Sequence, residues 1–211
     1  MITQVPSHAE MGWWDGQSSG LSGGDSKQGK TIAETTCAGC HGADGNSSDP
    51  AYPKLGGQSE TYLYRQILAF RAGVRKSDIM SGIVKALSDA DIANVASFYS
   101  QQTVQPDTVA DASLAAVGKQ IFFAGAGRGI GPACVMCHGR DEEEREMPMM
   151  GMMMGMMADV PRLNGQHAAY IVDQLNRFSS GERQSGVMGN IAGALSEMNR
   201  KAVAEYLSSL R

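Results

Sequence analysis

The sequence predicts an all-α protein made of two helical domains in tandem. Apolar residues recur at helical spacing in several windows, and no window of useful length alternates between apolar and polar residues as a strand does. In addition, the second half of the chain repeats motifs of the first half. A length of 211 residues is enough for two modest domains.

The internal repeat is found by aligning short motifs. The segment PKLGGQ at 53–58 matches PRLNGQ at 161–166, a shift of 108 residues. A motif of the form Cys-x-x-Cys-His occurs at 37–41 and again at 134–138, a shift of 97 residues. The shift grows by 11 (108 minus 97), so the second copy contains an insertion. This insertion coincides with the acidic and methionine-rich residues near 141–157.

The repeat also predicts the order of domains. We expect a flexible leader at 1–25, a first domain at 26–102, a linker at 103–113 and a second domain at 114–211. The leader is rich in glycine and serine, and the linker is polar, contains Pro106 and lacks periodicity.

Each domain is expected to contain the same three helices. One helix precedes each cysteine motif and is marked by Gly29 or Gly118. Another begins near Ser88, where Asp91 three residues later completes a capping-box pattern. Its apolar positions recur near the C-terminus as Val203, Ala204 and Leu207. The helix between these two carries apolar residues at i, i+4 and i+7, namely Leu63, Ile67 and Phe70, repeated as Ile171, Leu175 and Phe178.

The charge and hydropathy of the chain argue against two classes of protein. The net charge of −4 is mild, whereas binding of nucleic acid would require a basic stripe. No stretch approaches the roughly 18 consecutive apolar residues of a membrane span. The N-terminal residues also lack the basic and apolar regions of a secretory signal.

All four cysteines fall in the two Cys-x-x-Cys-His motifs. Cys-x-x-Cys alone is compatible with a redox dithiol, a disulfide or half of a zinc site. A histidine directly after the second cysteine is typical of covalent haem attachment. Two thiols on one turn can add to the two vinyl groups along a haem edge, which brings the next side chain beneath the iron. The sequence therefore predicts two covalently bound haems c, attached through Cys37, Cys40, Cys134 and Cys137, with His41 and His138 as proximal iron ligands.

Met80 and Met188 occupy equivalent positions at the shift of 108 residues. Methionine opposite histidine raises the potential of a haem and fills its second axial position, which suits electron transfer. The alternative is that both are gap-filling core side chains. Because both copies carry a methionine at this place, we expect Met80 and Met188 to be the distal iron ligands.

Taken together, these motifs resemble the cytochrome c4 family of dihaem bacterial electron carriers, which consist of two fused class I cytochrome c domains. The resemblance covers roughly residues 25–211 and also rests on LSDADIANVASFY and GIGPACVMCHG. It implies that each domain wraps one haem. It also implies that the backbone carbonyls of Pro53 and Pro161 accept hydrogen bonds from the proximal imidazoles, which fixes their tautomer and orientation.

The resemblance implies a periplasmic carrier of single electrons, from a donor of the cytochrome bc1 type to a terminal oxidase or reductase. An alternative is the electron-accepting haem subunit of a dehydrogenase, such as a flavocytochrome c sulfide dehydrogenase. A dihaem peroxidase is less favoured because it needs an open axial position. Covalent haem attachment takes place outside the cytoplasm, so we expect a signal peptide to have been removed. Peripheral association with a membrane is compatible with the sequence.

The methionine-rich run from Met147 to Met157 has three interpretations. It could be a loop folded over its own domain, an adaptable docking surface for a partner, or a Cu(I) site, since thioethers favour Cu(I). A haem ligand from this run is disfavoured, because Met156 lies only 18 residues after His138, on a tether too short to cross to the opposite face of the haem.

Overall fold

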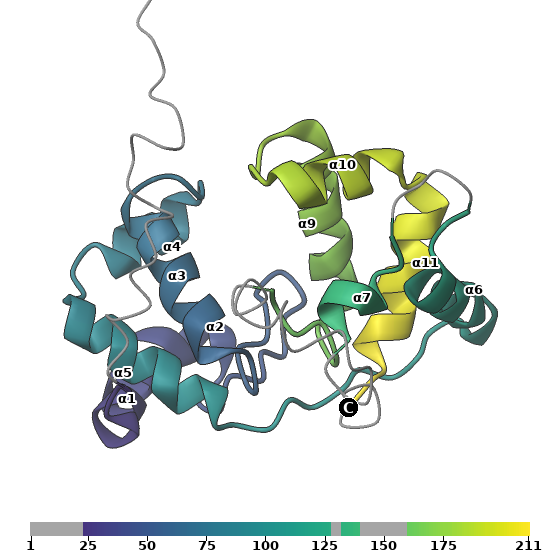
Figure 1. Cartoon of the computed structure of the whole chain (residues 1–211). Coiled ribbons are helices and arrows are strands. Elements are labelled where there is room, and N and C mark those ends of the chain that lie inside the picture. Colours follow the sequence, from purple (N-terminus) through teal and green to yellow (C-terminus); the bar gives the residue numbers. More distant parts are fainter. Residues whose placement is uncertain (1–22, 128–131, 140–159) are drawn as a thin grey trace, which may run out of the picture.

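The computed structural model describes residues 23–127, 132–139 and 160–211, and every regular element among them is helical. The helices form two groups, one from each half of the chain, joined by an extended linker (Figure 1). The prediction of an all-α protein with two domains is therefore confirmed. The leader up to residue 22 and the insertion near 141–157 lie outside the described residues.

The first domain is built on a continuous helical segment that carries the first cysteine motif. The predicted capping box is present, because Ser88 accepts from the Asp91 backbone and Asp91 accepts from the Ser88 backbone. The helices of this domain are α1 (Ser26–Ile32), the π-helical turn η2 (Ala33–Cys37), α2 (Ala38–His41), α3 (Glu60–Arg71), α4 (Asp78–Val84) and α5 (Asp89–Ser100).

The second domain repeats this plan with one difference. Its first helix ends at Gly125, whose φ of 79° terminates it, so the second cysteine motif lies on a separate short helix. That first helix starts at Ala112, inside the predicted linker, because Asp111 caps its N-terminus. The helices of this domain are α6 (Ala112–Ala124), α7 (Val135–His138), α9 (Ala168–Ser180), α10 (Gly186–Ala194) and α11 (Glu197–Ser208).

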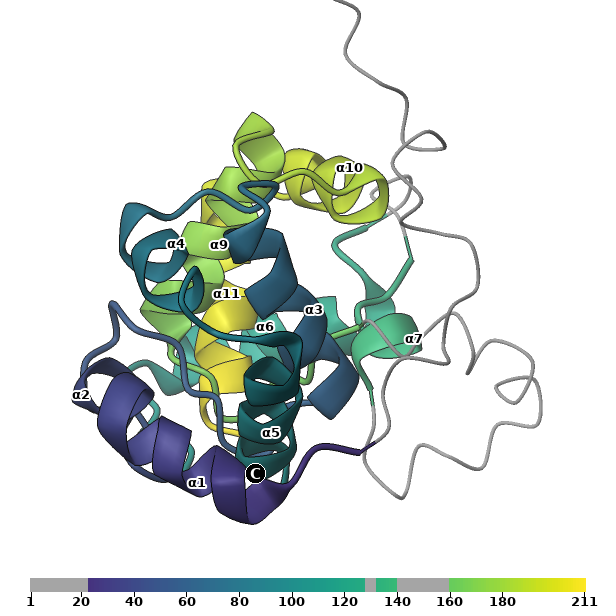
Figure 2. The ribbon, with the colours of Figure 1, turned by 90° about the vertical axis from the view of Figure 1, so that its left-hand side faces the viewer.

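Each domain contains one very close helix crossing, α1 on α5 and α6 on α11, and Figure 2 shows the first of them. A Cβ atom added at Gly29 would lie 1.9 Å from the backbone oxygen of Asn94. A Cβ atom added at Gly118 would lie 1.9 Å from the backbone oxygen of Ala202. Both crossings thus depend on direct backbone contact, which explains why the predicted first helices share a glycine.

The two domains are joined by a pair of symmetry-related contacts. The side-chain amide of Gln58 brackets the backbone of Arg162, accepting from its N–H at 2.8 Å and donating to its carbonyl at 2.8 Å. Gln166 brackets the backbone of Lys54 in the same way, with both distances at 2.9 Å. Each pair is converted into the other by the shift of 108 residues, so the domains meet across an approximate two-fold axis.

The linker is fixed to both domains through Asp107. Its carboxylate accepts from Lys54 Nζ at 2.5 Å and from His167 Nδ1 at 2.8 Å. His167 Nε2 lies 2.9 Å from the carbonyl oxygen of Ser47 in the first domain. Because a carbonyl only accepts and the Asp107 carboxylate also accepts, this buried imidazole donates from both ring nitrogens.

Acid is expected to weaken this connection. Burial alone would raise the pKa of Asp107, but the hydrogen bonds from Lys54 and His167 outweigh it and lower the pKa. A carboxyl with a depressed pKa adds stability above its unfolded pKa of about 3.9, and this stability is lost as pH falls through the lower folded pKa. Asp107→Asn should therefore reduce the free energy of unfolding at pH 7 by about 2 kcal/mol.

This difference should shrink as the wild-type carboxyl is protonated, which urea denaturation between pH 7 and pH 2 would measure. Asp173→Asn is the matched control, because Asp173 forms an exposed ion pair with Arg177 and should cost less than about 1 kcal/mol. A pH-independent gap between wild type and Asp107→Asn would contradict the prediction.

Candidate functional site

The first cysteine motif lies where the helix of the first domain changes pitch. Cys37 ends the π-helical turn η2, and Cys40 and His41 follow on α2. π-Helical turns of this kind often occur at functional sites. All four cysteines of the chain are free thiols, and each is partly buried.

The two described thiols with shifted pKa values do not behave as a redox pair. Burial raises the pKa of Cys37 to about 11, against a smaller lowering by the Tyr99 hydroxyl. Burial also raises the pKa of Cys134. Catalytic dithiols need the opposite, a lowered pKa that yields a thiolate. A shared Cys₄ zinc site is not formed either, since no three His, Cys, Asp or Glu side chains of residues 23–127, 132–139 and 160–211 converge.

His41 is buried and held in one orientation. Its Nδ1 lies 2.8 Å from the carbonyl oxygen of Pro53, as the resemblance implied. The carbonyl can only accept, so Nδ1 carries the proton and Nε2 carries the lone pair. Burial lowers the pKa of His41 while the bond to Pro53 opposes this, which favours the neutral ring that a metal requires.

Backbone hydrogen bonds hold the loop that carries Pro53. The carbonyl of Gly45 accepts from Leu55 N at 2.7 Å and from Gly56 N at 3.2 Å. Gly45 has a φ of 79°, and a Cβ atom there would lie 2.5 Å from Gly56 N. Only glycine satisfies both conditions, and the loop therefore returns Pro53 to His41.

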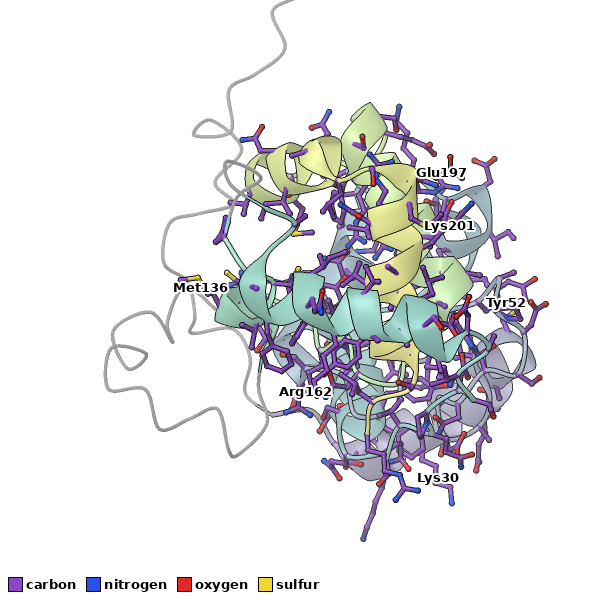
Figure 3. All side chains as sticks on the ribbon, turned by 90° about the vertical axis from the view of Figure 1, so that its right-hand side faces the viewer. Lys30, Tyr52, Met136, Arg162, Glu197 and Lys201 are labelled. Carbon is purple, nitrogen blue, oxygen red and sulfur yellow. The ribbon has the colours of Figure 1, made fainter. Side chains whose placement is uncertain are left out.

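The second domain repeats this geometry despite its separate helix α7. His138 Nδ1 lies 3.0 Å from the carbonyl oxygen of Pro161. Cys134 packs against the core of the domain. Met136, between the two cysteines, is 55% exposed and lies at the outer surface of α7 (Figure 3).

Met80 and Met188 lie at the same position of equivalent helices. Met80 N donates to the Ser77 cap of α4 at 3.2 Å, and Met188 N donates to the Ser185 cap of α10 at 3.2 Å. Both side chains are partly buried, and Met188 packs against the core of its domain. The fold thus places a methionine at the third residue of a short helix in each domain.

The sequence analysis missed the residues that join the domains. Gln58 and Gln166 stood in the matching motifs, but the repeat was interpreted as shared packing within each domain. His167 was set aside as a spare histidine at a predicted helix start, and it is the N-cap residue of α9 that bridges Ser47 and Asp107. Agreement of polar residues at one shift was the signal that could have found the glutamines.

The residues present fit a haem c in each domain. Each domain brings two free thiols, a histidine whose Nδ1 faces a proline carbonyl, and a methionine on a separate helix. A bound haem supplies a metal that changes its charge by one electron. The protein's part is to orient the imidazole and to shield the iron from solvent. These features define a two-domain c-type cytochrome.

Comparison with known proteins agrees with this class. A family model described as cytochrome c matches residues 26–102 and 115–211. Cytochrome c4 of Pseudomonas aeruginosa is 36% identical over 191 residues, 89% of each chain. The thiosulfate dehydrogenase electron acceptor of Thiomonas intermedia is 32% identical over 82% of this chain and 78% of its own. Reduced cytochrome c4 from Pseudomonas stutzeri superposes with a TM-score of 0.78 at 33% identity, over 89% of this chain and 100% of that chain.

The chain belongs to the cytochrome c4 family. It is accordingly an electron-transfer protein rather than an enzyme, and its cofactor is covalently bound haem c. A count of two haems fits its two domains.

Proposed function

We propose that the domain at 26–102 holds one haem through Cys37, Cys40, His41 and Met80, and that the domain at 114–211 holds the other through Cys134, Cys137, His138 and Met188. The observation that carries this proposal is the imidazole-to-proline hydrogen bond, present in both domains at 2.8 and 3.0 Å. Because Nδ1 is committed to Pro53 or Pro161, Nε2 is the nitrogen available to iron.

The resulting function is a shuttle for single electrons in the bacterial periplasm, from a donor of the cytochrome bc1 type to a terminal oxidase or reductase. Two haems with both axial positions filled hold electrons without binding a substrate. Among the described residues, none of the helices combines the length and apolar character needed to cross a bilayer. A signal peptide removed on export and peripheral contact with the membrane belong to the same proposal.

The testing experiment is a redox titration of the holoprotein, followed in visible and near-infrared spectra. We expect two haems per chain, each with the methionine–iron charge-transfer band in its oxidised form and each at a positive potential. A high-spin spectrum from either haem would contradict the proposed ligands and would favour a dihaem peroxidase.

A second candidate is an electron-accepting subunit of a dehydrogenase. The relative from Thiomonas intermedia named as a thiosulfate dehydrogenase electron acceptor supports it. The flavocytochrome c sulfide dehydrogenase type is another form of this candidate. Stable co-purification with a dehydrogenase, from cells that express the tagged holoprotein at native level, would favour the subunit over the free shuttle.

Copper binding by Met147 to Met157 stays a prediction from thioether density, since this run lies outside the described residues. A Cu(I) titration of the holoprotein against a competing chelator tests it. The absence of a tight site would leave a covering loop or a docking surface as the interpretation of this run.

A further inference from the structure

Arg75 connects the two domains from the turn between α3 and α4. Its Nη1 donates to Gln66 Oε1 at 2.7 Å in its own domain. Its Nη2 donates to Tyr170 Oη at 2.7 Å and to Gln174 Oε1 at 2.9 Å, both on α9 of the other domain. The helices α3 and α9, which carry these acceptors, face each other in Figure 1.

Arg183 makes the same contacts with the domains exchanged. Its Nη1 donates to Gln174 Oε1 at 2.7 Å, and its Nη2 donates to Tyr62 Oη at 2.9 Å and to Gln66 Oε1 at 3.0 Å. The two guanidinium groups therefore share the amide oxygens of Gln66 and Gln174. Two positive charges meet at one place in the domain interface.

This centre has no negative partner in the described chain. None of the ion pairs formed by residues 23–127, 132–139 and 160–211 includes Arg75 or Arg183. Each guanidinium instead lies over a phenylalanine ring of its own domain, Phe70 at 4.6 Å and Phe178 at 4.5 Å. Aromatic faces and amide oxygens attract a cation but do not neutralise it. Partly buried charges are normally paired, so the centre lacks an anion.

The field of this centre is visible in the groups around it. Burial alone would raise the pKa of Tyr62, but Arg183 and Arg75 outweigh burial and lower it. Burial alone would lower the pKa of Arg75, but Tyr170 and Tyr62 outweigh burial and raise it. Both arginines thus act as cations on the same tyrosine.

We propose that Arg75 and Arg183 form one carboxylate-binding site shared by the two domains, and that carboxylates of the two haems occupy it. This inference rests on the proposed attachment and axial ligands. Arg75 lies five residues before Met80, and Arg183 lies five residues before Met188, so the site adjoins both proposed haem positions. Haem c has two propionate carboxylates that thioether attachment leaves free, and the fork of a guanidinium matches a carboxylate.

The crossed contacts give this site a specific consequence. Because each arginine is bonded within both domains, its charge acts on both haems. A nearby cation favours the added electron and raises the reduction potential. The charge of one arginine therefore contributes to the potentials of both haems, and removal of either arginine lowers both.

The test compares holoprotein variants by redox titration and by redox-difference infrared spectra of the haem carboxylates. Arg75→Gln and Arg183→Gln should each lower both midpoint potentials, with a change of about tenfold in the reduction equilibrium of at least one haem, or about 59 mV for one electron. Both variants should also shift the carboxylate bands. Arg75→Lys keeps the charge but not the fork, and it should preserve the potentials while shifting the bands.

Arg177→Gln is the matched control, since Arg177 is more exposed and already paired with Asp173 and Glu182. It should change neither readout. A shift confined to the haem of the substituted domain, or unchanged potentials in both glutamine variants, would overturn the shared site. Carboxylate bands that stay fixed, with wild-type potentials that respond to added phosphate, would assign the site to a soluble anion. Retention of the methionine–iron band in wild type separates these outcomes from a failure of the proposed axial ligands.

Discussion

Replacing Met188 by alanine is expected to remove the methionine–iron charge-transfer band of one haem and to lower its midpoint potential by more than about 60 mV, which is a factor of ten for a one-electron couple. The thioether stabilises the reduced iron, so its loss favours the oxidised form. The other haem should keep its band. Near-infrared spectra combined with a potentiometric titration of the holoprotein measure both effects.

Met198→Ala is the control for this prediction, because Met198 is 62% exposed on α11 and should leave both haems unchanged. Met80→Ala should produce the mirror result, with loss of the other band. A charge-transfer band that survives in Met188→Ala would contradict the assignment. The run from Met147 to Met157 would then become the source of the ligand.

Replacing Gly118 by alanine is expected to lower the free energy of unfolding by about 3 kcal/mol, the upper part of the range for overpacked cores. The new methyl group would lie 1.9 Å from the backbone oxygen of Ala202 and 2.9 Å from Tyr206 Cβ. The helices α6 and α11 would have to separate. Alanine is the better helix former by about 1 kcal/mol, and this gain is too small to compensate.

Gly193→Ala gives the matched comparison, because Gly193 is also helical but nothing lies within 4 Å of a Cβ atom there. That variant should be more stable than wild type by about 0.5–1 kcal/mol. Urea denaturation of the holoproteins measures both changes. A Gly118→Ala protein as stable as wild type would show that the crossing relaxes without cost.

Local features of the fold could be predicted from sequence because they depend on neighbours along the chain. The capping box of Ser88 and Asp91 is an example, since both of its hydrogen bonds join residues three apart. The apolar stripe predicted for α9 is confirmed at Ile171 and Leu175, which are buried. Phe178 in the same stripe is only partly buried, because its ring lies beneath Arg183 at the domain interface.

The interface itself could not be predicted from spacing. Gln58 and Gln166 bind backbone atoms of the opposite domain, and a backbone N–H or carbonyl has no residue type that a motif could reveal. The contacts of Arg75 and Arg183 join residues about 100 positions apart. Their arrangement depends on how two finished domains dock, which local propensity does not encode.

Recognition through the main chain also bears on how this molecule diverged after its ancestral domain was duplicated. Gln58 and Gln166 contact only the backbones of Arg162 and Lys54, so the docking of the two copies imposes no choice of side chain at those positions. The two positions have since taken different tasks. Lys54 turns inward to Asp107, while Arg162 turns outward and reaches the carbonyl of Gly57. The duplicated halves were therefore free to specialise one at a time without coming apart.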